Sequence, residues 1–131
     1  MKKKLLAMLM ASVMVLGLAA CGGGAAEAPA EDTAATGVLI YKYDDTYIST
    51  VRNALEAALD GKAEVIMQDG KGDQATQNDQ LDVMIEKGVD VLAVNMVDAK
   101  AAAGVVEKAK EAGIPTVFFN REPDTEVIAS Y

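Results

Sequence analysis

The stretch GVLIYKYDDTY, residues 37–47, decides how this chain folds. Residues 38–43 are apolar, β-branched or aromatic for the most part, and the run has the length of a strand. Two carboxylates, Asp44 and Asp45, follow it directly, and a helical pattern begins at the next residue. A strand that leads into a helix through a short acidic turn places polar groups at its carboxyl end, where open parallel α/β sheets bind their ligands.

The rest of the chain repeats this alternation of strand and helix. Apolar runs of strand length alternate with segments that have helical spacing and end near glycines. The expected helices are residues 46–59, 74–87 and 99–112, and the further strands are residues 63–68, 89–94 and 115–119. Such alternation predicts an open parallel α/β sheet with helices on both faces and right-handed crossovers.

Composition excludes several classes of function. The 131 residues include no histidine and one cysteine, and 20 acidic residues outnumber 12 basic ones, which gives a net charge of −8. No histidine can therefore act in acid–base catalysis, and no disulfide can form within the chain. The acidic balance argues against nucleic acid as a partner. No Gly-rich phosphate loop follows the first strand, so we expect a binding protein rather than an enzyme.

The first twenty residues predict a targeting signal. A basic start of three lysines precedes residues 5–18, an apolar run of 14 residues. Because a membrane span needs about 18–20 such residues, residues 1–20 are interpreted as a signal peptide. Residues 18–21, Leu-Ala-Ala-Cys, resemble a bacterial lipobox, which implies cleavage before Cys21 and a lipid on its sulfur. The alternative is an ordinary signal peptide with an incidental cysteine.

Residues 21–36 carry glycine, alanine, glutamate and proline but no large apolar side chain. Such a segment cannot build a core, and it predicts a flexible tether that holds residues 37–131 off a membrane surface. The expected location is therefore outside the cytoplasm, anchored to the cell membrane through Cys21.

The four predicted strands deliver polar side chains to one edge of the sheet. These are Asp44, Asp45, Asp69, Asn95, Asn120 and Arg121, joined by the ring of Tyr47. Ionised carboxylates accept hydrogen bonds and donate none, so they suit a partner rich in O–H donors, or a metal ion. A sugar offers hydroxyls around its rim and C–H bonds on its faces, which amides, carboxylates and an aromatic ring can cover. The alternative is structural: Asp45 or Thr46 caps the helix, and Asp44 belongs to the turn.

Four segments carry a resemblance to a known family. They are Tyr41-Lys-Tyr-Asp-Asp45, Gln77-Asn-Asp-Gln80, Val91-Leu-Ala-Val-Asn95 and Val117-Phe-Phe-Asn-Arg-Glu-Pro123. In this order and spacing they resemble the amino-terminal lobe of bacterial galactose/glucose-binding proteins, which serve sugar ABC transporters. The resemblance covers residues 37 to the end. It implies an incomplete amino-terminal lobe of the type I periplasmic binding protein fold, which would bind a glucose- or galactose-type monosaccharide for an ABC permease and, in some cases, a chemoreceptor.

The resemblance also implies roles for single residues. Asp45 would accept hydrogen bonds from sugar hydroxyls, Tyr47 would stack on a sugar face, and Asn120 would bond a ring hydroxyl. Arg121 would lie near the mouth or hinge, and Asn95 would be a turn or supporting residue. We expect no cofactor in this stretch, because the family's calcium loop belongs to the second lobe. Residues 77–80 are expected to form a polar helix surface.

Other functions share the predicted fold. A sensor lobe that presents sugar to a membrane receptor would use the same pocket. A receiver-like signalling domain needs an aspartate where Asn95 stands, and a sugar-responsive repressor core needs a basic DNA-binding head. The signal peptide counts against both of the last two.

Overall fold

Four parallel strands form one sheet in the order β2-β1-β3-β4. The structure is a computed structural model that describes residues 33–124 and 126–127. Its elements in chain order are β1 (Ala35–Ile40), α1 (Thr46–Leu59), β2 (Glu64–Asp69), α2 (Gln74–Lys87), β3 (Val91–Val94), η1 (Ala99–Ala101), α3 (Ala102–Glu111) and β4 (Thr116–Phe118). The central strand β1 pairs with β2 and β3, so its carboxyl end is flanked on both sides.

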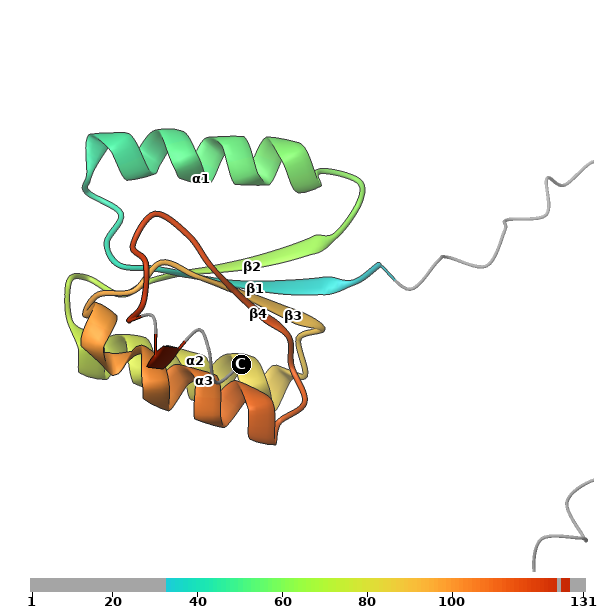
Figure 1. Cartoon of the computed structure of the whole chain (residues 1–131). Coiled ribbons are helices and arrows are strands. Elements are labelled where there is room, and N and C mark those ends of the chain that lie inside the picture. The colour runs from blue at the N-terminus through green and yellow to red at the C-terminus, as the bar shows by residue number, and fades with distance from the viewer. Residues whose placement is uncertain (1–32, 125, 128–131) are drawn as a thin grey trace, which may run out of the picture.

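Helices cover both faces of the sheet, as the alternation predicts. Figure 1 shows α1 on one face, and α2 with α3 on the other. The larger core lies between the sheet and the α2/α3 pair, and includes Leu39, Leu81, Met84, Leu92 and Val105. The smaller core under α1 consists of Val38, Ile40, Tyr41 and Ile48, with partly buried side chains packed around it. The two faces are therefore unequally packed, and only Ile48 of α1 is buried.

Both long helices begin and end where the sequence predicts. An aspartate side chain caps each amino end: Asp45 accepts from the N–H of Ile48 and Asp73 from the N–H of Thr76. Side-chain oxygens at this position satisfy N–H groups that have no partner within the helix. These caps fix the points at which the chain leaves the sheet edge and enters α1 and α2.

The strand bounds differ from the prediction, most of all in β1. The expected strand, residues 38–43, is replaced by Ala35–Ile40. Pairing with Glu64 and Val65 of β2 recruits Ala35 and Thr36, although alanine is depleted in strands. At the other end, the Tyr41 N–H donates to a side chain instead of a strand. The residues after Ile40 are thereby released into the loop that leads to α1.

Smaller differences affect four other elements. The expected helix 99–112 divides into η1 and α3, because Asp98 accepts from the N–H of Lys100 and tightens the first turn. The structure also places β2 at Glu64–Asp69, one residue later than predicted, and shortens the last two strands to Val91–Val94 and Thr116–Phe118. None of these shifts changes the order of the elements.

Candidate ligand-binding site

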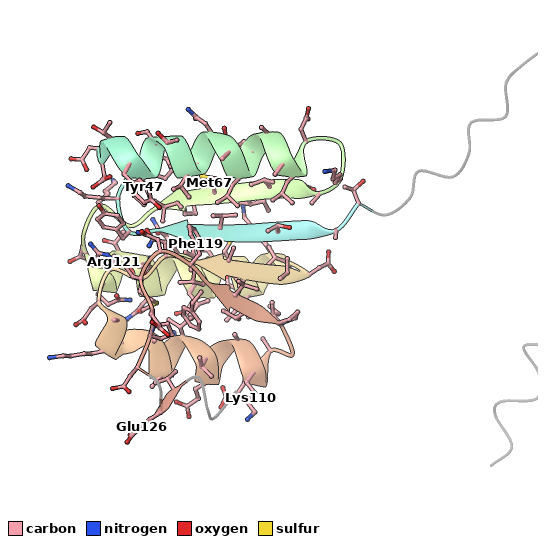
Figure 2. The ribbon with its side chains drawn as sticks, turned by 45° about the horizontal axis from the view of Figure 1, so that its top comes forward. Tyr47, Met67, Lys110, Phe119, Arg121 and Glu126 are labelled. Carbon is pink, nitrogen blue, oxygen red and sulfur yellow. The ribbon has the colours of Figure 1, made fainter. Side chains whose placement is uncertain are left out.

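The loops that follow the four strands meet at one end of the sheet. The parallel register brings the carboxyl ends of β1, β2, β3 and β4 side by side. Figure 2 shows Tyr47, Phe119 and Arg121 at this end, whereas Lys110 lies at the opposite end. The structure thus gathers at one edge the polar groups that the sequence places after each strand.

Asp45 stands at the start of α1 with both carboxylate oxygens engaged. Its Oδ1 accepts from the N–H of Ile48 at 3.0 Å, and its Oδ2 accepts from the hydroxyl of Tyr41 at 2.5 Å. The Tyr41 hydroxyl, followed by the Ile48 N–H, lowers the pKa of the Asp45 carboxyl below its ordinary value. Asp45 therefore does cap the helix, and it is held as an ionised acceptor with a further lone pair on each oxygen.

Tyr47 and Asp44 flank this carboxylate and differ in their surroundings. The Tyr47 side chain lies in the first turn of α1 and is 62% exposed. Asp44 points to solvent and pairs with Lys42 at 3.3 Å, an arrangement typical of a turn residue. The ring of Tyr47 is thus available to a solute at the sheet edge.

Two buried amides join the loops beneath the surface. Asn95 is fully buried; its Nδ2 donates to the Phe119 carbonyl, and its Oδ1 accepts from the Tyr41 N–H. Gln77 is also fully buried; its Nε2 donates to the Asn95 carbonyl, and its Oε1 accepts from the Val97 N–H. Asn95 thus ties the ends of β1, β3 and β4 together.

The prediction that residues 77–80 form a polar helix surface was wrong for Gln77. Its position one turn after the Asp73 cap brings the side chain over the end of β3, where two backbone groups need partners. The sequence signal that could have found it is the spacing from that cap, since Gln77 falls on the same inward face as Leu81 and Met84.

The chain after β4 contributes Asn120 and Arg121. Asn120 is exposed and has a φ of 62°, a left-handed conformation that asparagine tolerates better than most residues. The Nη1 of Arg121 donates to the carbonyl of Val97 at 2.6 Å, and its Cζ lies 4.0 Å from the centre of the Tyr41 ring. The guanidinium therefore connects the end of β4 to the loops after β1 and β3.

Asp69, the last residue of β2, organises its own loop. Its Oδ1 accepts from the N–H groups of Tyr43 and Lys71 at 3.0 and 2.9 Å. The next residue, Gly70, approaches β1 so closely that a Cβ there would lie 2.9 Å from the Ile40 carbonyl oxygen. These contacts hold the loop after β2 against the loop after β1.

A pocket of about 470 Å³ adjoins this edge beside α3 and β4. Apolar side chains, among them Val106, Phe118 and Pro123, form much of its wall, and Asn120 and Arg121 stand at its polar part. Neither Asp45 nor Tyr47 lines it. The predicted binding residues consequently divide into a group at the start of α1 and a group after β4, and the contact of Arg121 with Tyr41 joins the two groups.

Two features of the described residues bear on ions and membranes. Within residues 33–124 and 126–127, no three or more carboxylate, thiol or imidazole groups gather as they would around a metal ion. No helix in the same part of the chain is long and apolar enough to span a bilayer. The predicted signal peptide and the Cys21 anchor lie outside the described residues.

Comparison with known proteins gives consistent matches. The D-galactose/methyl-galactoside binding periplasmic protein of Haemophilus influenzae is 45% identical over 97 residues, which cover 72% of this chain and 29% of that protein. The xylitol-binding protein of Mycolicibacterium smegmatis is 32% identical over 120 residues, which cover 91% and 34% of the two chains. The present chain thus spans about a third of the length of these relatives.

The fold has solved counterparts as well. The crystal structure of an ABC transporter solute binding protein from Bacillus halodurans, with bound myo-inositol, matches with a TM-score of 0.65 and 32% identity, over 71% of this chain and 33% of that one. Residues 36–131 match the family model described as a periplasmic binding protein domain, which covers nearly all of the described residues. This chain belongs to the periplasmic binding protein domain family.

Proposed function

We propose that this chain contributes one wall of an extracytoplasmic binding site for a glucose- or galactose-type monosaccharide, which is delivered to an ABC transporter permease. The role is binding rather than catalysis, in keeping with a family of solute-binding proteins. The observation that carries the proposal is that the Asp45 carboxylate, held by two hydrogen bonds, and the exposed Tyr47 ring both stand at the amino end of α1.

The chemistry of the edge matches the chemistry of a sugar. The Asp45 carboxylate accepts from neighbouring hydroxyls, and a charge-assisted hydrogen bond of this kind is stronger than a neutral one. The Tyr47 ring covers a face of C–H bonds, and Asn120 offers both an acceptor and a donor to a third position on the ring. Asn95, which is buried and bonded to backbone, serves as a supporting residue in this arrangement.

The relatives support this choice among the alternatives. The 45% identity to a D-galactose/methyl-galactoside binding protein favours a hexose. A receiver-like domain would need an accessible phosphate-accepting aspartate after β3, where this chain has a fully buried asparagine. We further propose that the domain lies outside the cytoplasm, and that a lipid on Cys21 anchors it to the membrane.

The test is a titration of the isotope-labelled chain with D-galactose and D-glucose, followed by backbone amide shifts. We expect saturable shifts confined to the loops after β1, β3 and β4, with a dissociation constant in the millimolar range. Weak binding is expected because ligand sites usually bury about 70–90% of their ligand, and a single wall covers one face.

The matched control is the double variant Asp45→Ala/Tyr47→Ala, which removes the proposed acceptor and stacking surface together. It should lose the saturable shifts while keeping a folded amide spectrum. Shifts that survive in the double variant, or that cluster at the amino ends of the strands, would contradict the proposed site.

A further inference from the structure

The Tyr41 side chain is the immediate partner of the proposed ligand-binding carboxylate. It is the first residue after β1, and 9% of it is exposed. Its hydroxyl donates to Oδ2 of Asp45, four residues further along the chain. The segment between β1 and α1 turns so that the side chains of its residues Tyr41 and Asp45 meet.

Three further contacts fix the position of Tyr41. Its N–H donates to the buried Asn95 side chain at 3.4 Å, and its carbonyl accepts from the Gly72 N–H at 2.7 Å. The guanidinium of Arg121 lies over its ring, at 4.0 Å from the centre, and is itself tied to the Val97 carbonyl. The backbone of Tyr41 is thus bonded to the segments after β2 and β3, and its ring is covered by Arg121 from the segment after β4.

The effect on Asp45 goes beyond that of a helix cap. A capping bond to Ile48 engages Oδ1 alone, and the second oxygen of such a carboxylate is ordinarily free to take its donor from water. Here Oδ2 is engaged as well, so the plane of the carboxylate is set by two donors on opposite oxygens. The remaining lone pairs keep fixed directions toward a solute, which reduces the cost of ordering the group on binding.

We propose that Tyr41 is a positioning residue for sugar recognition: its hydroxyl orients the Asp45 carboxylate and keeps it an acceptor. The inference rests on the proposed function, because Asp45 is the group through which Tyr41 acts. The charged side chain that acts on Asp45 is Lys42, which itself pairs with Asp44. The guanidinium of Arg121 lies over the ring of Tyr41.

The first arm of the test needs no sugar. The side-chain carboxyl signal of Asp45 is titrated by NMR in the full chain, in the wild type and in Tyr41→Phe, which keeps the ring under Arg121. We expect the pKa of Asp45 to move upward in the variant, toward the ordinary aspartate value. The matched control is Tyr43→Phe, because the Tyr43 ring also lies under an arginine, Arg52, at 3.5 Å. The control should leave the pKa of Asp45 where it is.

The second arm uses D-galactose as the probe. We expect Tyr41→Phe to weaken binding roughly three- to tenfold at neutral pH, the range of one hydrogen bond. When galactose affinity is measured against pH, the pH at which acid begins to weaken binding should also be higher in the variant. A merely structural role would not produce this change. Tyr43→Phe should leave both the affinity and its dependence on pH unchanged.

The outcomes separate this inference from the function on which it rests. An unchanged pKa of Asp45 in Tyr41→Phe, or equal galactose affinity in variant and wild type, overturns the positioning role while sugar binding stands. A wild-type chain that gives no saturable shift with galactose overturns the proposed function, and the inference falls with it. Only a raised pKa together with weakened binding supports the positioning role.

Discussion

The two ends of the sheet are built in different ways. At the amino ends, each helix returns to the sheet through a short turn that contains a glycine at positive φ, namely Gly61, Gly88 and Gly113. Most of the bonds in these turns join backbone to backbone, as between the Gly88 N–H and the Ile85 carbonyl. At the carboxyl ends, buried or partly buried side chains carry the connections, above all Gln77 and Asn95.

This difference separates two tasks. A glycine turn reverses the chain at low steric cost and presents no side chain to solvent. Buried amides bond loops to one another and leave the outer rim to Asp45, Tyr47 and Asn120. Polar groups that are buried and satisfied specify a unique arrangement, because any displacement leaves a partner unpaired. The carboxyl end therefore combines a layer of buried amides with an exposed rim, whereas the amino end joins helices to strands mainly through backbone turns.

The largest effect should come from removing the amide beneath the rim. Gln77→Leu leaves the Val97 N–H and the Asn95 carbonyl without their partner, and each unpaired group costs about 1–3 kcal/mol. We expect the free energy of unfolding to fall by about 2–4 kcal/mol in urea denaturation followed by circular dichroism. Asp79→Leu on the exposed side of the same helix should change it by less than about 0.5 kcal/mol. An equal loss of unfolding free energy in the two variants would contradict the distinction between the buried amides and the exposed surface of α2.

The next effect concerns the rim and should appear in binding. Asp45→Asn keeps the helix cap, since asparagine caps as well as aspartate, but replaces one acceptor oxygen with a donor. We expect D-galactose affinity to fall at least tenfold in the amide-shift titration, about the worth of one charge-assisted bond. Asp44→Asn is the control and should bind like the wild type. A greater loss in Asp44→Asn than in Asp45→Asn would move the site by one residue and reopen the assignment of Asn120.

A glycine substitution tests the amino end. At Gly88, φ is 68° and no heavy atom lies within 4 Å of where a Cβ would stand, so Gly88→Ala changes the backbone preference alone. We expect a loss of about 1 kcal/mol in the free energy of unfolding, with galactose affinity unchanged. Gly104→Ala inside α3 is equally open and should instead stabilise the chain by roughly 0.5–1 kcal/mol. Weakened sugar binding in Gly88→Ala would show that the two ends are coupled.

The smallest effect is a pH dependence confined to the carboxyl end. Asp45 and Asp73 cap α1 and α2 there, and hydrogen bonds lower the pKa of both carboxyls below the ordinary 3.8, from Tyr41 and Ile48 in one case and from Thr76 in the other. Groups with a depressed folded-state pKa stabilise the fold fully above the unfolded pKa and lose that effect as the pH falls through the folded value. Stability should therefore decline below about pH 4–5.

The double variant Asp45→Asn/Asp73→Asn isolates this contribution. Its caps remain but no longer titrate, so its free energy of unfolding should decline less steeply between pH 5 and pH 2.5 than that of the wild type. Urea denaturation at a series of pH values measures the slope. Parallel slopes in the two proteins would place the acid sensitivity elsewhere in the chain.

Sequence by itself determined the order of the elements, the parallel sheet with helices on both faces, and the bounds of α1 and α2. These follow from signals that act within a few residues: apolar spacing, the aspartate caps and the glycine stops. It also determined which side chains arrive at the carboxyl edge of the sheet, because in a parallel sheet every strand delivers its next residues to the same end.

Only the tertiary structure decided how those side chains are used. The start of β1 at Ala35 depends on pairing with β2, and its end at Ile40 depends on bonds to Asn95 and the loop after β2. Helical spacing places Gln77 on the inward face of α2, but only the assembled sheet decides that it bonds the Asn95 carbonyl and the Val97 N–H. No spacing in the chain reveals that Arg121 covers the Tyr41 ring. Such contacts join residues that lie far apart along the chain, so their energies depend on the assembled fold and leave no local pattern in the sequence.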